Sequence, residues 1–168
     1  MKKDLLIVFA AVLLIAALIS GTEFQTVDEY YLTHLDDITA ESETVTLSIR
    51  SDEYVPADGV ILPETRLVLR SGDTAFDLLY RVVRSRQIQF EYQGADKNRF
   101  GSAYVKGIHY LYEFSCGPAS GWIYRVNGEF PPEGCSRYAL HNGDVVEWIY
   151  TCDLGGDAGL SLNASGGN

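Results

Sequence analysis

Three cysteines and three histidines are the side chains of this 168-residue chain with the strongest potential for nucleophilic or metal chemistry. They are widely separated along the chain: Cys116, Cys135 and Cys152, and His34, His109 and His141. A nucleophilic cysteine needs a base within hydrogen-bond reach and a further group that orients the base. Zinc sites need ligands in close pairs. Because the sequence has neither pattern, we expect no enzyme activity, no metal site and no bound cofactor.

An odd number of cysteines in an exported chain indicates one disulfide and one remaining thiol. If 121–127 and 144–151 are neighbouring antiparallel strands, Cys116 and Cys152 lie at the same end of the pair. We therefore favour the pairing Cys116–Cys152. The other two pairings stay open, since connectivity cannot be deduced from sequence. Cys135 would then be buried or would pair with another chain.

Hydrophobic periodicity predicts an α+β fold in which one helix packs on a mixed sheet. Residues 74–87 have apolar side chains at helical spacing, and Thr74 with Asp77 resembles a capping box. Alternation predicts strands at 44–50, 65–73, 88–92, 108–114, 121–127 and 144–151. Two Asn-Gly pairs, at 127–128 and 142–143, indicate turns beside the last two strands.

The last three predicted strands carry their aromatic side chains on one face. The residues on that face are Tyr110, Tyr112, Phe114, Trp122, Tyr124, Val126, Val146, Trp148 and Tyr150. The opposite face carries Glu113, Arg125 and Glu147, so we expect it to meet solvent. The aromatic face is expected to pack beneath the helix. A ligand-stacking platform is the alternative, and both hold if rings at the sheet margin stay open.

The two ends of the chain differ from the predicted folded part at 44–153. Residues 1–21 join a basic start to an apolar run at 5–19, which is typical of a signal peptide or an N-terminal membrane-anchor helix. Residues 22–43 are interpreted as an acidic spacer, and the Gly-, Ser- and Asn-rich 154–168 as a flexible tail. We therefore expect an extracytoplasmic chain, secreted or anchored to the cell membrane by its N-terminal segment.

The net charge of −10 argues against nucleic acid as a partner, because phosphate binding needs a clustered basic face. It also argues against attraction to anionic lipid. We expect contact with the membrane only through the N-terminal segment.

Four stretches of the chain resemble the C-terminal domain of transcobalamin-like proteins: SGDTAFDLLYRV, GSAYVKGIHY, GWIYRVNGEFP and GCSRYALHNGDVVEWIYT. This family has bacterial members of uncharacterised function and is related to SLBB-type β-grasp domains. The resemblance covers about residues 44–153, and its most specific parts are 121–128 and 142–148. It implies a β-grasp-like mixed sheet packed on one helix. It also implies an extracytoplasmic role in binding a ligand or partner, with cobalamin as the named ligand.

We favour a ligand-binding accessory module that presents cobalamin or a related corrinoid to a membrane transporter. The candidate ligand-binding residues are aromatic and lie at predicted loops or strand ends: Tyr104, Trp122, Phe130 and Tyr138. Packing and turn support are the alternative roles for these rings. A cell-surface module that binds a protein or a glycan, without a small-molecule ligand, is the alternative function.

Overall fold

The structure is a computed structural model that describes residues 38–51 and 59–160. Its strands are β1 (Thr44–Arg50), β2 (Val60–Val68), β3 (Phe90–Gln93), β4 (Tyr104–Ile108), β5 (Leu111–Tyr112), β6 (Gly121–Val126) and β7 (Val145–Thr151). Within these described ranges there is one α-helix, α3 (Ala75–Ser85), and one 3-10 turn, η1 (Ala95–Lys97). The α+β prediction is therefore confirmed for this part of the chain.

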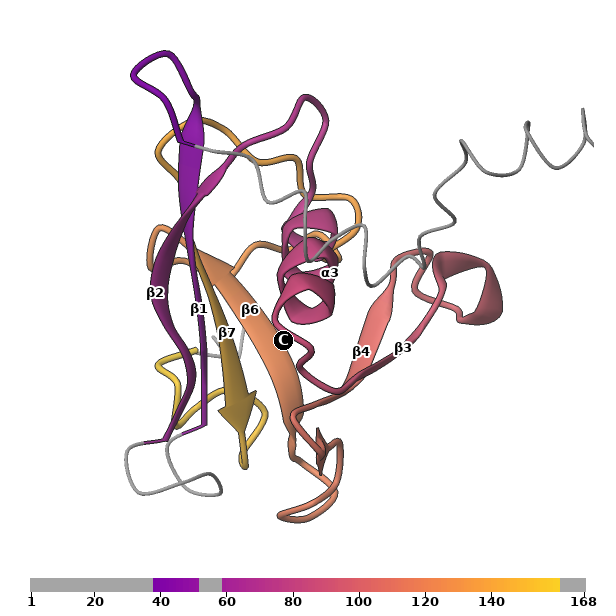
Figure 1. Ribbon diagram of the computed structural model, residues 1–168. Helices are drawn as coiled ribbons and strands as arrows, with labels where there is room; N and C mark the ends of the chain where they lie inside the picture. Colours follow the sequence, from indigo (N-terminus) through magenta and orange to yellow (C-terminus); the bar gives the residue numbers. More distant parts are fainter. Residues whose placement is uncertain (1–37, 52–58, 161–168) are drawn as a thin grey trace, which may run out of the picture.

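The strands form two sheets, where the sequence pattern suggested one. The first is mixed and has the order β2-β1-β7-β6, with β1 and β7 parallel and the other pairs antiparallel. The second is antiparallel and has the order β3-β4-β5. Figure 1 shows α3 between the four-stranded sheet and the β3–β4 hairpin. The helix therefore needs apolar side chains on two sides, one facing each sheet.

The core lies between α3 and the four-stranded sheet. Fully buried side chains of the helix meet those of the two central strands: Leu78, Leu79, Val82 and Val83 from α3, Val45, Leu47 and Ile49 from β1, and Val146 and Trp148 from β7. The pattern agrees with the helical and strand periods of the sequence. Burial of this apolar surface is the main favourable term in holding the two layers together.

Polar contacts fix the start and the middle of α3. The predicted capping box is present: the Asp77 backbone N–H donates to Thr74 Oγ1 at 3.2 Å, and the Thr74 N–H donates to Asp77 Oδ2 at 3.0 Å. Further along, Arg81 is buried and forms an ion pair with Asp73 at 2.9 Å. Arg81 also donates to the Val68 carbonyl oxygen at 2.8 Å, which ties the helix to the end of β2.

The predicted strand at 108–114 is wrong. The chain reverses at His109 and Tyr110, whose φ angles are 53° and 63°, and only Leu111–Tyr112 continues as β5. Two consecutive residues with positive φ are characteristic of the tightest hairpin turns, which usually contain Asn or Gly. With those markers missing, the alternating apolar residues on either side looked like one strand. β2 is also shifted: it spans 60–68, where 65–73 was expected.

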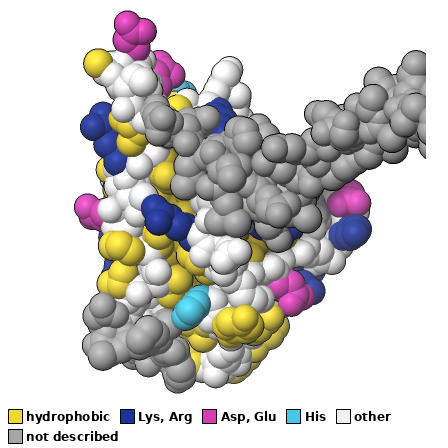
Figure 2. Space-filling model, in the orientation of Figure 1, with side chains coloured by type: hydrophobic (Ala, Val, Ile, Leu, Met, Phe, Trp, Pro, Cys, Tyr) yellow, Lys and Arg dark blue, Asp and Glu magenta, His cyan; other side chains and the backbone are white. Residues whose placement is uncertain are grey.

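The aromatic face is therefore confirmed for β6 and β7 but not for 108–114. Trp122, Trp148 and Tyr150 are buried, as predicted. Tyr110 is 75% exposed and Phe114 is 60% exposed, because the turns at these residues direct both rings away from the core. Figure 2 shows hydrophobic side chains gathered at the lower end of the molecule, the end that carries the β4–β5 hairpin in Figure 1.

The opposite face of β6 and β7 carries the predicted charges. Arg125 Nη2 donates to Glu147 Oε1 at 2.7 Å, and both side chains are partly exposed. Cross-strand pairs of opposite charge stabilise a sheet modestly. This face is consistent with the expected contact with solvent.

The structure describes only part of the segments expected at the two chain ends. The signal or anchor segment at 1–21 and most of the spacer at 22–43 lie outside the described residues. In the part that the structure describes, no helix is long and apolar enough to cross a bilayer. Residues 154–160, from the segment interpreted as a flexible tail, form turns closed by backbone hydrogen bonds, among them Leu160 to Gly155 at 2.8 Å.

Candidate functional site

An aromatic pocket lies where β4 approaches β6, and its volume is about 400 Å³. Its walls come from β4, β6, β7 and the loop that follows β6. The lining residues are Ala103, Tyr104, Val105, Trp122, Ile123, Tyr124, Phe130, Pro131, Pro132, Cys135, Trp148 and Leu160. None of these side chains carries a charge at neutral pH, so the pocket suits an uncharged, mainly apolar ligand surface.

The position of β6 at the edge of its sheet opens this pocket. β6 pairs with β7 on one side, while its other side faces β4 without forming a ladder. Trp122 and Tyr124 point to the same face of β6 because strand side chains alternate. The Tyr124 ring stacks on Trp148, with centroids 5.5 Å apart and planes 29° apart. The two rings therefore support each other.

The loop at 130–138 closes the other side of the pocket. It is held against β4 because the Ala103 N–H donates to Ser136 Oγ at 2.9 Å and Cys135 Sγ donates to the Ala103 carbonyl at 3.2 Å. It is held against the start of α3 because the Phe76 N–H donates to the Cys135 carbonyl at 3.0 Å. Phe130, Pro131 and Pro132 thus belong to a loop that is hydrogen-bonded both to the start of β4 and to the start of α3.

The Trp148 side chain has a buried hydrogen-bond donor without a partner. Its residue is 2% exposed, and its indole Nε1–H makes no hydrogen bond. Ser51 Oγ is the other such buried side-chain atom among the described residues. An unpaired buried donor costs about 1–3 kcal/mol. Trp148 lines the pocket, but its Nε1 atom has almost no exposed surface, so a ligand acceptor would reach it only after neighbouring side chains move.

The ionisable groups of the pocket are held in their neutral forms. Burial raises the pKa of the Cys135 thiol to about 11. Burial, and then the hydrogen bond to Glu113, raises the pKa of Tyr104 to about 12. Burial also raises the pKa of Tyr124. A thiol that stays protonated is a poor nucleophile.

Three of the four predicted ligand-binding residues meet in this pocket. Tyr104, Trp122 and Phe130 line it, although they come from β4, β6 and the following loop. Tyr138 is not a lining residue, but its ring packs edge-on against Tyr124 at a centroid distance of 6.2 Å. Three further lining residues were not predicted as ligand-binding: Tyr124 and Trp148 were assigned to the core, and Cys135 was expected to be buried or to pair with another chain. The Pro131-Pro132 pair, which cannot continue a strand ladder, was an available sign of a shaped loop.

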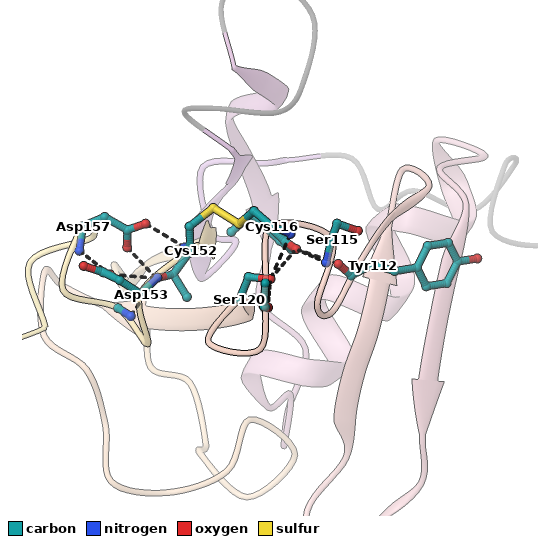
Figure 3. The surroundings of a disulfide bond; sticks show 11 residues. Tyr112, Ser115, Cys116, Ser120, Cys152, Asp153 and Asp157 are labelled. Atoms are coloured by element: carbon teal, nitrogen blue, oxygen red, sulfur yellow. Dashed lines mark hydrogen bonds between the residues drawn. A yellow bond between two sulfur atoms is a disulfide. The ribbon is translucent and has the colours of Figure 1, made fainter.

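The predicted disulfide is confirmed. Cys116 and Cys152 are joined, with Cα atoms 5.7 Å apart, and Cys135 is a buried free thiol. Figure 3 shows the bond with Ser115 and Ser120 on one side and Asp153 and Asp157 on the other. The Cys116 N–H donates to Ser120 Oγ at 3.2 Å, and the Cys152 N–H donates to Asp157 Oδ2 at 2.7 Å. A hydrogen bond from the backbone N–H to a nearby side chain therefore holds each half-cystine in place.

The acidic side chains near the disulfide accept hydrogen bonds from backbone N–H groups. Asp157 accepts from Cys152, and the Asp157 N–H donates to Asp153 Oδ1 at 2.7 Å. Hydrogen bonds from the backbone and from Thr151 outweigh burial and lower the pKa of Asp157. Across the described ranges, no group of three or more Cys, His, Asp and Glu side chains could hold a metal ion.

The fold and the site define a small α+β domain with an uncharged aromatic pocket at a sheet edge and a disulfide at one end. Residues 72–151 match the family model described as "Domain of unknown function (DUF4430)". This range runs from the approach to α3 to the end of β7, and it includes every residue of the pocket except Leu160. A comparison with curated proteins gives no match.

Two solved structures are similar to this chain. Haptocorrin, in a crystal structure with Cbi, has a TM-score of 0.54 and 17% identity, over 71% of this chain and 27% of that chain. This chain thus spans about a quarter of haptocorrin, and the likeness is one of fold. A protein from Ruminococcus gnavus that is proposed to bind metal has a TM-score of 0.43 and 10% identity, over 65% of this chain and 96% of that chain.

Proposed function

We propose that this chain is an extracytoplasmic ligand-binding module with a β-grasp fold, and that the aromatic pocket beside β6 is its ligand site. The main support is the uncharged aromatic lining of the pocket, and the unpaired indole donor of the lining residue Trp148 adds to it. Stacked rings offer flat apolar contact, and one donor without a partner selects a ligand that carries an acceptor. Both properties favour a neutral ring system with carbonyl groups at its edge.

A corrinoid fits this description, because its ring is flat and its edge carries amide groups. The resemblance to transcobalamin-like proteins supports this ligand, and so does the fold shared with haptocorrin, which was solved in complex with Cbi. A corrinoid is larger than a volume of about 400 Å³. The pocket would therefore hold one side of the ligand and leave the other side for a second protein, which we propose is a membrane transporter.

An extracytoplasmic location accords with the disulfide, since such bonds persist outside the reducing cytoplasm. The apolar run at 5–19 supports the same location. We propose that the N-terminal segment exports the chain or anchors it to the membrane.

The ligand is tested by calorimetry of the full-length chain with cyanocobalamin and, separately, with dicyanocobinamide. Phe130→Ala removes a ring from the pocket and should weaken binding about tenfold. Phe114→Ala is the matched control, because Phe114 is an exposed aromatic residue outside the pocket, and it should bind like the unaltered chain.

Two results would contradict the proposal in different ways. The absence of binding heat with either corrinoid at high micromolar concentration would refute the ligand class. Equal affinities for Phe130→Ala and the unaltered chain would show that a corrinoid binds elsewhere.

A further inference from the structure

A second hollow lies at the carboxyl end of α3, and it shares no residue with the aromatic pocket. Its volume is about 420 Å³. It is lined by the last turns of the helix, the segment that follows, β3 and the β4–β5 turn. The lining residues are Tyr80, Val83, Arg84, Gln87, Ile88, Gln89, Phe90, Tyr92 and Tyr110. We refer to it as the helix-end cleft.

One wall of the helix-end cleft is a cluster of aromatic rings. Phe90 and Tyr92 are stacked, with centroids 5.5 Å apart and planes 24° apart. The edge of Tyr80 meets Tyr92 at 5.9 Å. Phe76 supports Tyr92 from α3, with centroids 4.9 Å apart. Tyr92 is nevertheless 41% exposed, so the cluster offers part of a ring surface to solvent.

The other wall is formed by a tyrosine on a constrained turn. Tyr110 has a φ of 63° and is 75% exposed, so packing does not explain why a large ring occupies a backbone conformation that favours glycine. Gln89 fixes the turn: its Oε1 accepts from the Tyr110 N–H at 2.7 Å, and its Nε2 donates to Tyr112 Oη at 2.8 Å. The ring is thus carried by a backbone that is already ordered before any ligand binds.

The polar groups of the cleft are mostly neutral. The Gln87 amide and the hydroxyls of Tyr92 and Tyr110 make no hydrogen bond to another described residue. Arg84 is the only charged lining residue; its guanidinium lies 5.3 Å from the Tyr80 ring centroid and donates to the Tyr80 hydroxyl. A positive charge in the cleft opposes a cationic ligand. One guanidinium already engaged with a ring is a poor phosphate site, which usually has several donors.

We propose that the helix-end cleft binds a saccharide. A pyranose ring has a face of C–H groups that packs against aromatic rings, and its rim of hydroxyls both donates and accepts hydrogen bonds. Tyr92 and Tyr110 supply the rings on the two walls, and the Gln87 amide supplies a donor and an acceptor. This site goes beyond the proposed corrinoid pocket and is independent of it, because the two hollows have no residue in common.

The test is isothermal calorimetry of the full-length chain with three soluble probes: maltotriose, cellotriose and tri-N-acetylchitotriose. The chain is kept in a detergent without a sugar headgroup, because a maltoside would compete. At least one trisaccharide should bind, and Tyr110→Ala should weaken that binding about tenfold. Because Tyr110 is largely exposed, this change should leave the fold intact, which circular dichroism checks.

Two further variants separate the cleft from other surfaces. Tyr110→Phe keeps the ring and should retain most of the affinity, whereas Phe114→Ala removes another largely exposed ring outside the cleft and should have no effect. Phe130→Ala, in the other pocket, should also leave saccharide binding unchanged. The proposal is overturned if none of the three trisaccharides binds, or if Tyr110→Ala and Phe114→Ala bind equally well. Adenosine, which carries a flat ring, is used as a further probe. If adenosine binds and no saccharide does, the proposed ligand class is wrong.

Discussion

At the scale of single residues, Cys135 is a cysteine whose surroundings suppress its reactivity. The residue is 5% exposed, its thiol donates to the Ala103 carbonyl, and burial raises its pKa to about 11. It therefore contributes a small apolar surface to the aromatic pocket. The sequence predicted that a leftover cysteine would be buried or would join another chain, and the structure shows the first of these outcomes.

The raised pKa of Cys135 predicts a loss of stability in alkaline solution. Because the folded chain holds the thiol proton more tightly than the unfolded chain does, this contribution is complete below about pH 9 and is lost as the pH rises towards about 11. Urea denaturation across this range should show a smaller decrease in unfolding free energy for Cys135→Ala than for the unaltered chain. Identical pH profiles for the two proteins would show that the thiol is not buried in solution.

The Trp148 indole is a residue-scale feature that no sequence pattern reveals. Alternation along 145–151 placed its ring in the core, which is confirmed. Whether its N–H finds an acceptor depends on which backbone carbonyls lie within reach. For Trp122 the Leu111 carbonyl is 2.9 Å away, while Trp148 has no such neighbour. The two indoles differ only because of how β5, β6 and β7 are placed relative to one another.

At the scale of elements, the sequence predicted what depends on local pattern. The helix and its capping box, β1, β6 and β7 were recognised because period and turn residues agree in each. β4 and the turn after it were not, because His109 and Tyr110 adopt a conformation that their residue types do not indicate. Tyr104 and Phe130 were named as candidates from their positions alone. Their meeting in one pocket depends on how β4 approaches β6, which is a tertiary property.

The loop at 130–138 depends on a glycine for its position. A Cβ atom at Gly134 would overlap the Cβ and Oγ atoms of Ser102, which pairs with Ser136. Gly134→Ala should therefore displace the loop and lower the unfolding free energy by about 1–3 kcal/mol. Chemical denaturation measures the loss. Gly121→Ala is the matched control, because no atom lies within 4 Å of its added Cβ. Equal stabilities for the two variants would contradict this packing.

At the scale of the whole molecule, one disulfide connects segments that are distant in sequence. Cys116 and Cys152 are 36 residues apart, and the intervening chain contains β6, the pocket loop and β7. The bond therefore closes a loop around most of the aromatic pocket. Such a closure limits the conformations of the unfolded chain, which is the usual source of its stabilising effect.

Replacing both half-cystines tests this role. The double variant Cys116→Ser and Cys152→Ser should lose about 4 kcal/mol of unfolding free energy, as expected for a loop of this length. Guanidinium denaturation measures the difference. Cys135→Ser provides a comparison in which one cysteine is lost but no cross-link. If the double variant loses less than about 1 kcal/mol, the bond does not constrain the unfolded chain in the expected way.

The central claim is that the aromatic pocket holds a ligand whose acceptor satisfies Trp148. The chain has two tryptophans, so a ¹⁵N–¹H spectrum of the full-length chain contains two indole signals. Trp122 also lines the pocket, but its indole N–H already donates to the Leu111 carbonyl, so it should gain no new acceptor. On addition of dicyanocobinamide, the Trp148 indole proton should move to lower field as it gains an acceptor, and Phe130→Ala should reduce this shift. A Trp148 signal that stays in place while the corrinoid binds would contradict the account.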